Sequence, residues 1–382
     1  MPSVMHELIF LIGFLLLVTL LLSLDLGVFH KKDHVITFKE ATLWTCVWIG
    51  TALLFYGFIC LKGELIHGPE NMQQLQELNV RHGHGLNFSA LQDLDEQEAF
   101  DQGVKMYRKA LSLEYITGYL IEKMLSLDNI FVMIMIFMAF GVEKIYYHRV
   151  LFYGIIGAIV LRFIFIFTAS ALIQKFHWIL LLFGIILIYT GIKMFVDRNK
   201  KETMDVANHP MVKFTSKHKL STSSFHGHDF FAKIDGRWLM TPLFIVLMII
   251  EFSDVVFAFD SIPAIFSVTQ DPYIVFFSNI FAILGLRSLF FMLESVMDRF
   301  YYLKVGVAVL LAFIGVKMLL PFVSGLSFIN VDLSIGTGAS LIVIVSILTV
   351  SILASIFIPR KQQNDVETCH DASLQDKIET TD

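Results

Sequence analysis

Carboxylate side chains recur inside stretches of the sequence that are otherwise apolar. Two stretches carry them, YLIEKMLSLDNIFVMIMIF at 119–137 and IEFSDVVFAFDSIPAIF at 250–266. A carboxylate at the centre of a bilayer costs at least about 2.5 kcal/mol, so residues of this kind mark a functional site by default. Their oxygen donors suit Mg²⁺, Ca²⁺ and Mn²⁺ better than Cu⁺ or Zn²⁺. The candidate metal ligands are Glu122, Asp128, Asn129, Glu251, Asp254, Asp260 and Ser261.

Helical phase limits how these acids can meet. Glu122 and Asp128 are six residues apart and point about 240° apart on an intact helix, whereas Glu251 and Asp254, three apart, share a face. Either each helix contacts partners on two sides, or it unwinds near its second acid. Pro263 removes a backbone donor and predicts a kink or an opening just after Asp260.

Two arginines within apolar stretches, Arg162 and Arg287, are the candidate counter-ions. Five carboxylates against two arginines leave about three negative charges that apolar surroundings cannot solvate. A bound divalent cation plus a proton would account for that excess. The alternative is that Asp–Arg pairs only lock the helices together.

Other polar residues carry weaker signals. Asp25 lies near the end of the first apolar stretch, where it either reaches the membrane interface or belongs to an ion pathway. His82-Gly-His84 and His226-Gly-His228 could recruit a metal, but such pairs in polar loops are usually solvated, and we expect that here.

The elements that must position these residues are membrane-spanning helices. Of 382 residues, 56% are hydrophobic and 16% are charged, whereas an ordinary soluble domain is about 25% charged. A helix needs about 20 mostly apolar residues to cross a bilayer. We therefore predict an all-α polytopic membrane protein with about nine transmembrane helices. They are expected near 7–29, 40–61, 112–140, 149–172, 178–196, 239–266, 273–294, 301–323 and 335–358.

The two acidic stretches belong to a longer internal repeat. Glu122 is followed six residues later by Asp128, and Asp254 is followed six residues later by Asp260. The next spans carry GAIVLR, ending at Arg162, and AILGLR, ending at Arg287. GIKM and GVKM follow one span later. Three helices are an odd number, so the second unit enters the membrane from the opposite side. We predict two inverted three-helix repeats, which in secondary transporters place the substrate site where they meet.

Lysine and arginine in the loops predict the orientation. The 197–238 loop and the residues after the last span are basic, while the loops near 267–272 and 324–334 have no Lys or Arg. This predicts an N-terminus outside and a cytoplasmic C-terminus, with the basic residues of the 62–111 loop as the misfit. The basic residues follow topology and form no stripe, which argues against nucleic-acid binding. Three cysteines without CxxC spacing predict neither a disulfide framework nor a zinc motif.

The predicted organisation has seven parts. They are two N-terminal transmembrane helices (1–61), an extramembrane insertion (62–111), the first three-helix repeat (112–196), a cytoplasmic loop (197–238), the second repeat (239–323), the last transmembrane helix (324–358) and a polar cytoplasmic tail (359–382).

Several segments resemble the TerC integral membrane family, and its Alx-type members in particular. The resemblance rests on EYITGYLIEKMLSLDNIFV, IEFSDVVFAFDSIPAIF, NIFAILGLRSLFFML and LDLGVFHKK. It implies a multi-pass protein of the bacterial inner membrane, with a fold similar to the LysE-type exporters. It also implies a link to tellurium resistance, manganese export, divalent-metal homeostasis or membrane redox modulation.

Three functions follow as hypotheses. The first is export of divalent metal ions, with Mn²⁺ favoured as the substrate and protons as a candidate coupling ion. The second is a non-transporting scaffold or redox modulator in the response to metal or alkaline stress. The third, a membrane-embedded hydrolase, lacks a nucleophile motif and a catalytic histidine in the spans, so we expect no enzyme. No covalent cofactor is expected. The sequence does not predict an oligomeric state.

Overall fold

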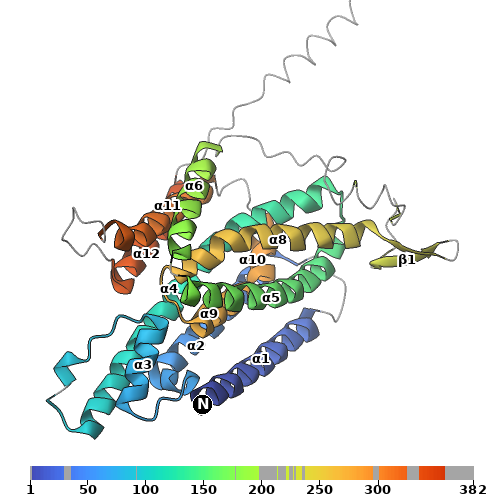
Figure 1. Cartoon of the computed structure of the whole chain (residues 1–382). Helices are drawn as coiled ribbons and strands as arrows, with labels where there is room; N and C mark the ends of the chain where they lie inside the picture. Colours follow the sequence, from blue (N-terminus) through green and yellow to red (C-terminus); the bar gives the residue numbers. More distant parts are fainter. Residues whose placement is uncertain are drawn as a thin grey trace, which may run out of the picture.

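In the computed structural model, helices make up most of the described residues, and the described strands form one two-stranded hairpin (Figure 1). The hairpin pairs β1 (Phe231–Ile234) antiparallel with β2 (Arg237–Met240). The described residues are 2–29, 36–91, 93–176, 178–197, 213, 221–222, 227, 229–234, 237–295, 301–324 and 335–357. Most of the predicted cytoplasmic loop, with His226 and His228, and the predicted tail lie outside them.

Seven described helices are long and apolar enough to cross a membrane, and an eighth span results if the bent pair is counted as one. The bent pair is α9 (Pro272–Leu284) and α10 (Leu286–Glu294), which meet at 42°. The prediction of a polytopic helical membrane protein is confirmed, with seven or eight candidate spans rather than about nine. The seven are α1 (Pro2–Phe29), α2 (Phe38–Lys62), α5 (Lys144–Lys175), α6 (Ile179–Asp197), α8 (Pro242–Phe266), α11 (Tyr301–Ser324) and α12 (Thr337–Phe357).

The predicted span 112–140 is part of a much longer helix, α4 (Glu96–Ala139), which is not among the seven. Its 44 residues extend for about 66 Å at 1.5 Å per residue, over twice the roughly 30 Å of a hydrocarbon core. The predicted boundary between insertion and repeat, at residue 111, therefore falls inside a continuous helix. The insertion therefore continues into the predicted first repeat without a break in the helix.

The rest of the insertion packs beside the start of α4. It contains two short turns, η1 (Gly63–Ile66) and η2 (Ser89–Leu91), and the helix α3 (Met72–His82). Asn71 caps the beginning of α3 by accepting from the Gln74 amide, and Gly83 ends it with a φ of +65°, which glycine adopts without steric cost. In Figure 1, α3 lies at the same end of the molecule as the N-terminus.

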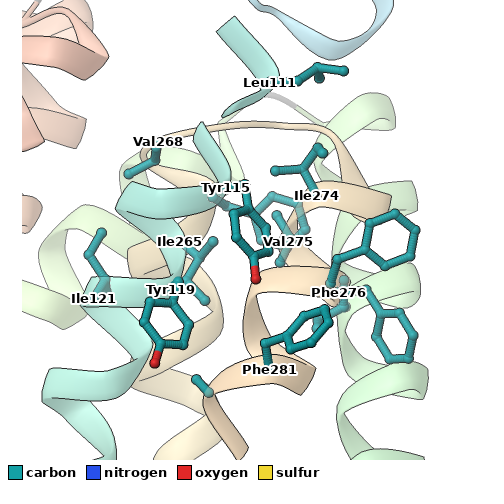
Figure 2. Close-up of a cluster of buried hydrophobic side chains, with 14 of the residues drawn as sticks. Leu111, Tyr115, Tyr119, Ile121, Ile265, Val268, Ile274, Val275, Phe276 and Phe281 are labelled. Carbon is teal, nitrogen blue, oxygen red and sulfur yellow. The ribbon is translucent and has the colours of Figure 1, made fainter. Parts of the chain in front are cut away.

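A densely packed core surrounds α9. Every residue of α9 except Tyr273 is buried, as expected for a helix that is apolar on all sides. Figure 2 shows how α4 side chains such as Tyr115 and Tyr119 meet Ile265 near the end of α8 and Phe281 on α9. This core fixes α4, α8 and α9 against one another, and these helices carry most of the acidic residues.

The opening predicted after Asp260 does not occur. Helix α8 continues through Pro263 to Phe266, because the proline lies so near the helix end that few hydrogen bonds depend on it. The chain bends instead in the next span, at Gly285 between α9 and α10. Helix α8 also starts at Pro242 rather than 239, since the preceding residues form β2.

Helices α6 and α11 approach each other closely at glycines. A Cβ added to Gly315 would lie 2.8 Å from the Gly184 carbonyl oxygen, and one added to Gly191 would lie 2.8 Å from the Ala308 carbonyl oxygen. Small residues allow membrane helices to approach in this way. GIKM and GVKM, which the sequence repeats, therefore begin at glycines of this helix contact.

Candidate ion site

Four buried polar side chains from four helices meet in the core, and we call them the Arg162 cluster. Helix α5 supplies Arg162, α4 supplies Glu122, α8 supplies Asp254 and α9 supplies Asn279. All are at most 5% exposed. Each residue is therefore buried between helices.

The guanidinium of Arg162 donates four hydrogen bonds within this cluster. Its Nη1 donates to Glu122 Oε1 and, over 2.7 Å, to Asn279 Oδ1. Its Nη2 donates to Asp254 Oδ1 over 3.1 Å and its Nε to Asp254 Oδ2 over 3.4 Å. Asn279 in turn donates to Glu122 Oε2 over 3.2 Å. One cation thus holds a carboxylate from each of the two acidic stretches.

A third carboxylate, Glu251, lies beside the cluster without a cation of its own. Its Oε2 is buried and has no hydrogen-bond partner among the described residues. Together with Arg162 and Asp254, it lines a small cavity of about 20 Å³. This volume has room for roughly one water-sized molecule or ion. Gly157 makes room for this carboxylate, because a Cβ there would overlap it.

The second acid of each stretch, Asp128 or Asp260, lies outside the Arg162 cluster. Helices α4 and α8 are not unwound at these acids, so each helix contacts partners on two sides. Asp260 is half-buried and accepts a hydrogen bond of 3.1 Å from Thr190 on α6. Asp128 is also half-buried and is not among the hydrogen-bond partners of Arg162. Of their neighbours, Asn129 is buried. Ser261 is buried near Glu122.

Arg287, the other expected counter-ion, lies in a separate pair. Its Nη2 is 2.6 Å from Asp25 Oδ1 on α1, and its Nη1 is 2.7 Å from His148 Nε2. Asp25 is 2% exposed, so its side chain is buried within the protein. Arg287 was expected to neutralise the acidic stretches, whereas the structure pairs it with Asp25 on α1.

Two residues of the core were missed by sequence reasoning. Asn279 bridges Glu122 and Arg162, but a single amide in an apolar stretch gives no spacing signal. Lys123 donates over 3.2 Å to the Ala282 carbonyl and adds a cation that the charge count omitted. Its position directly after Glu122 was visible, but nothing in the sequence placed it in the interior.

A second set of titratable side chains lies where the insertion meets α1 and the turn before α9; we call it the histidine cluster. It comprises Glu7, His67, His82, His84 and Asp271. One ligand atom each of Glu7, His67 and His82 lies within 4.8 Å of the others. His82 is 1% exposed, so the expectation that this His-Gly-His pair would be solvated was wrong for His82.

Burial and charge pull the pKa values of this cluster apart. Burial lowers the pKa of His82 to about 4. Burial also lowers the pKa of His84, but the charge and hydrogen bond of Glu114 outweigh it, so the net pKa is raised. Burial raises the pKa of Asp271, while His67 and His82 outweigh it and hold that pKa well below its usual range. His82 is therefore neutral and Asp271 ionised near pH 7.

Comparison with known proteins decides the family. The integral membrane protein TerC family matches residues 107–363, a range that contains every member of the Arg162 cluster. The chain belongs to the TerC family. The match begins inside α4, so Glu7, His67, His82 and His84 lie outside it.

Relatives extend the similarity over most of the chain. "Uncharacterized membrane protein STKORF319" of Myxococcus xanthus is 42% identical over 90% of this chain and 91% of its own length. "Putative membrane-bound redox modulator Alx" of Escherichia coli strain K12 is 37% identical over 85% of this chain and 88% of its own length. The expected similarity to Alx-type members is thereby confirmed. No solved structure matches the chain.

Proposed function

We propose that this TerC protein exports divalent metal ions across the bacterial inner membrane, with Mn²⁺ as its favoured substrate. The observation that carries the proposal is Glu251. Its buried carboxylate oxygen has no partner among the described residues and faces a cavity beside Asp254. A buried carboxylate without a counter-ion is costly, and a transient cation would relieve that cost.

The proposal includes an inverted repeat, with units at about 112–196 and 239–323. Two contacts support it. Glu122 and Asp254, which hold the same place in the two acidic stretches, bind one guanidinium. The third helices of the two units, α6 and α11, approach at Gly184 and Gly315. Such units meet around the substrate in secondary transporters, which then alternate access by rocking one unit against the other.

Arg162 would act as a resident cation that an incoming ion partly replaces. The two oxygens of Asp254 bind Arg162, while Glu251 has an oxygen to offer. A metal ion entering the cavity would bind Glu251 first and then draw Asp254 from Arg162, which stays paired with Glu122. Asp254 would exchange one cationic partner for another, so the free energies of binding and releasing the ion would stay similar.

The donors around this cavity favour a hard cation. Carboxylates and the nearby hydroxyl of Ser261 offer oxygen only, which suits Mn²⁺ and Mg²⁺ more than Zn²⁺. Asp128 and Asp260, which lie outside the Arg162 cluster, would serve the path on either side. Carboxylates along such a path also carry protons, which we propose as the coupling ion.

The test is manganese transport by purified protein in sealed vesicles and total manganese in expressing cells. Glu251→Gln and Asp254→Asn should each abolish most of the transport that wild type supports. Glu143→Gln is the matched control, because Glu143 is exposed at the beginning of α5. Equal transport by all four proteins would exclude this acid site as the transport site.

A second function, a non-transporting scaffold or redox modulator, is favoured by one observation. The hydrogen bonds of Arg162 to Glu122 and Asp254 have the geometry of a structural lock as well as that of an ion site. The cysteines offer this function little, since Cys46 and Cys60 are free and exposed on one helix. The scaffold predicts no metal flux from wild type in vesicles, whereas the exporter predicts flux that survives replacement of all three cysteines by serine.

A further inference from the structure

The histidine cluster lies at the junction of segments far apart in the sequence. Glu7 comes from α1, His67 follows η1, His82 and His84 flank the end of α3, and Asp271 caps α9. We propose that this cluster is a second metal site, which binds a transition-metal dication such as Zn²⁺. The site is separate from the Arg162 cluster and does not depend on the function proposed above.

Unsatisfied polar atoms are the first evidence. Six buried atoms of the cluster have no hydrogen-bond partner among the described residues: Glu7 Oε1, His67 Nε2, both ring nitrogens of His82, His84 Nε2 and Asp271 Oδ2. Buried polar groups in folded proteins are nearly always paired, so six exceptions in one place need an explanation. A metal ion would bind one nitrogen of each ring together with the carboxylate oxygens, and so satisfy most of these atoms.

The separations of these atoms fit one ion. His67 Nε2 and Asp271 Oδ2 lie 3.4 Å apart, about the distance between two ligand atoms that are each roughly 2.0–2.1 Å from a tetrahedral Zn²⁺. Ligand atoms of Glu7, His67 and His82 lie within 4.8 Å of one another. The His67 and His82 rings are 5.1 Å apart between centroids. A closure of about 1 Å, within the range of side-chain rotation, would complete the coordination.

Hydrogen bonds behind the ligands already fix the rings. The Tyr107 hydroxyl lies 2.8 Å from His67 Nδ1, and Glu114 Oε1 lies 2.9 Å from His84 Nδ1. Thr269 holds Glu114 by donating over 2.7 Å to its Oε2. In metal sites the outer ring nitrogen is typically bound to a carboxylate or a similar acceptor, which leaves the inner nitrogen for the metal. His84 with Glu114 has this arrangement.

A structural ion pair explains less. Asp271 and His67 alone could join the insertion to the start of α9, and Arg81 Nη1 lies 3.5 Å from Glu7 Oε1. Neither pair accounts for His82, whose two ring nitrogens both lack partners in the described structure. A neutral imidazole has one nitrogen lone pair that can bind a metal ion, whereas a protonated imidazole would need two hydrogen-bond acceptors.

The donor set identifies the class of metal. Up to three imidazoles and two carboxylates favour borderline ions such as Zn²⁺, Co²⁺ or Ni²⁺, whereas Mg²⁺ and Ca²⁺ prefer oxygen alone. The Arg162 cluster and Glu251 lack imidazole altogether. The two sites would therefore prefer different ions.

A route to the cluster is present. A pocket of about 840 Å³ adjoins it, with His84 and Glu114 in the wall between them and Lys317 from α11 on the other side. An ion could reach His84 from this pocket after a small side-chain movement. The pocket is lined by residues just after α3, such as Gly83, and by residues of α11, such as Pro321.

The experiment measures metal binding by the purified full-length chain after treatment with a chelator. Calorimetry with Zn²⁺, and the visible absorption of bound Co²⁺, should report a site that Mg²⁺ does not fill. His67→Gln combined with His82→Gln should weaken Zn²⁺ binding by about 100-fold and remove the Co²⁺ bands, since even outer-shell changes cost 10- to 100-fold. Glu251→Gln, which alters the other site, should leave both signals unchanged.

The matched control replaces the other His-Gly-His pair, His226→Gln with His228→Gln, and should bind Zn²⁺ as wild type does. Glu114→Gln is a milder variant that retains every ligand and should weaken binding about tenfold. The proposal is overturned if wild type shows no Zn²⁺ binding, or if the His67/His82 variant and Glu114→Gln bind Zn²⁺ with wild-type affinity. Loss of binding in the His226/His228 control alone would overturn it too.

Discussion

The Arg162 cluster and the histidine cluster place buried acids under opposite conditions. In the first, one guanidinium binds Glu122 and Asp254, and Glu251 beside the cluster has an oxygen without a partner among the described residues. In the second, six buried atoms have no hydrogen-bond partner among the described residues. The first cluster is therefore stable without any ligand, whereas the second depends on one for its polar atoms. The following predictions test this difference, from the largest effect to the smallest.

Removal of the resident cation should have the largest effect. Arg162→Met leaves Glu122 and Asp254 buried without a counter-ion, which should lower the free energy of unfolding by roughly 3–5 kcal/mol. Thermal unfolding in detergent measures this loss. Arg149→Met is the control on the same helix, because Arg149 only stacks on the Phe230 ring, 5.0 Å away. Equal losses for the two variants would mean that the Arg162 cluster is not stabilised by its ion pairs.

Filling the space next to Glu251 should impair transport with less effect on folding. Gly157→Ala puts a methyl group where the Glu251 carboxylate lies, whereas Gly154→Ala, one turn earlier, meets no atom closer than 3.7 Å. The affinity for Mn²⁺ should fall by about tenfold in Gly157→Ala, a loss of roughly 1.4 kcal/mol. Flux into vesicles at several Mn²⁺ concentrations measures it. Unchanged flux from Gly157→Ala, or an equal fall in Gly154→Ala, would contradict the site.

The two aspartates of the second acidic stretch, Asp254 and Asp260, should differ in how strongly their replacement reduces manganese flux. Asp254→Asn acts inside the Arg162 cluster, while Asp260→Asn alters a side chain that accepts a hydrogen bond from Thr190 and does not contact Arg162. Manganese flux should therefore fall several-fold more in Asp254→Asn than in Asp260→Asn. The opposite order would move the ion site towards α6 and away from Arg162.

The smallest effect should come from the histidine cluster in the presence of a chelator. His82→Leu removes a buried ring that makes no hydrogen bond, so the unfolding free energy should change by no more than about 1 kcal/mol. The same variant should lose the rise in unfolding temperature that Zn²⁺ gives wild type. A large loss of stability under chelation would show that His82 is already paired in the folded state.

The sequence predicted the Arg162 cluster in part because its members are repeated. Glu122 and Asp254 stand at matching places in two similar stretches, and Arg162 was one of the two arginines expected to pair with such acids. Arg287 stands at the matching place for the second unit, yet it pairs with Asp25. Spacing along a helix gives the face on which a residue lies but not the neighbouring helix that this face contacts. Here the chain bends at Gly285, just before Arg287, and Arg287 contacts Asp25 on α1.

The histidine cluster could not be assembled from the sequence. Its ligands come from four segments, and only His82-Gly-His84 gave a local signal. Glu7 and Asp271 are 264 residues apart in the numbering, since 271 minus 7 is 264, and no periodic pattern joins them. Composition and hydropathy, by contrast, were sufficient for the class of protein, because long apolar helices have few alternatives to a membrane.

Helix α4 is continuous and connects the Arg162 cluster with the histidine cluster. Glu114, which orients His84, and Glu122, which binds Arg162, stand on the same uninterrupted helix. Eight residues of helix separate them by about 12 Å. A helix resists stretching, because its length is set by a continuous ladder of hydrogen bonds. Any sliding or rotation of α4 during the proposed transport cycle must therefore displace Glu114 and Glu122 together.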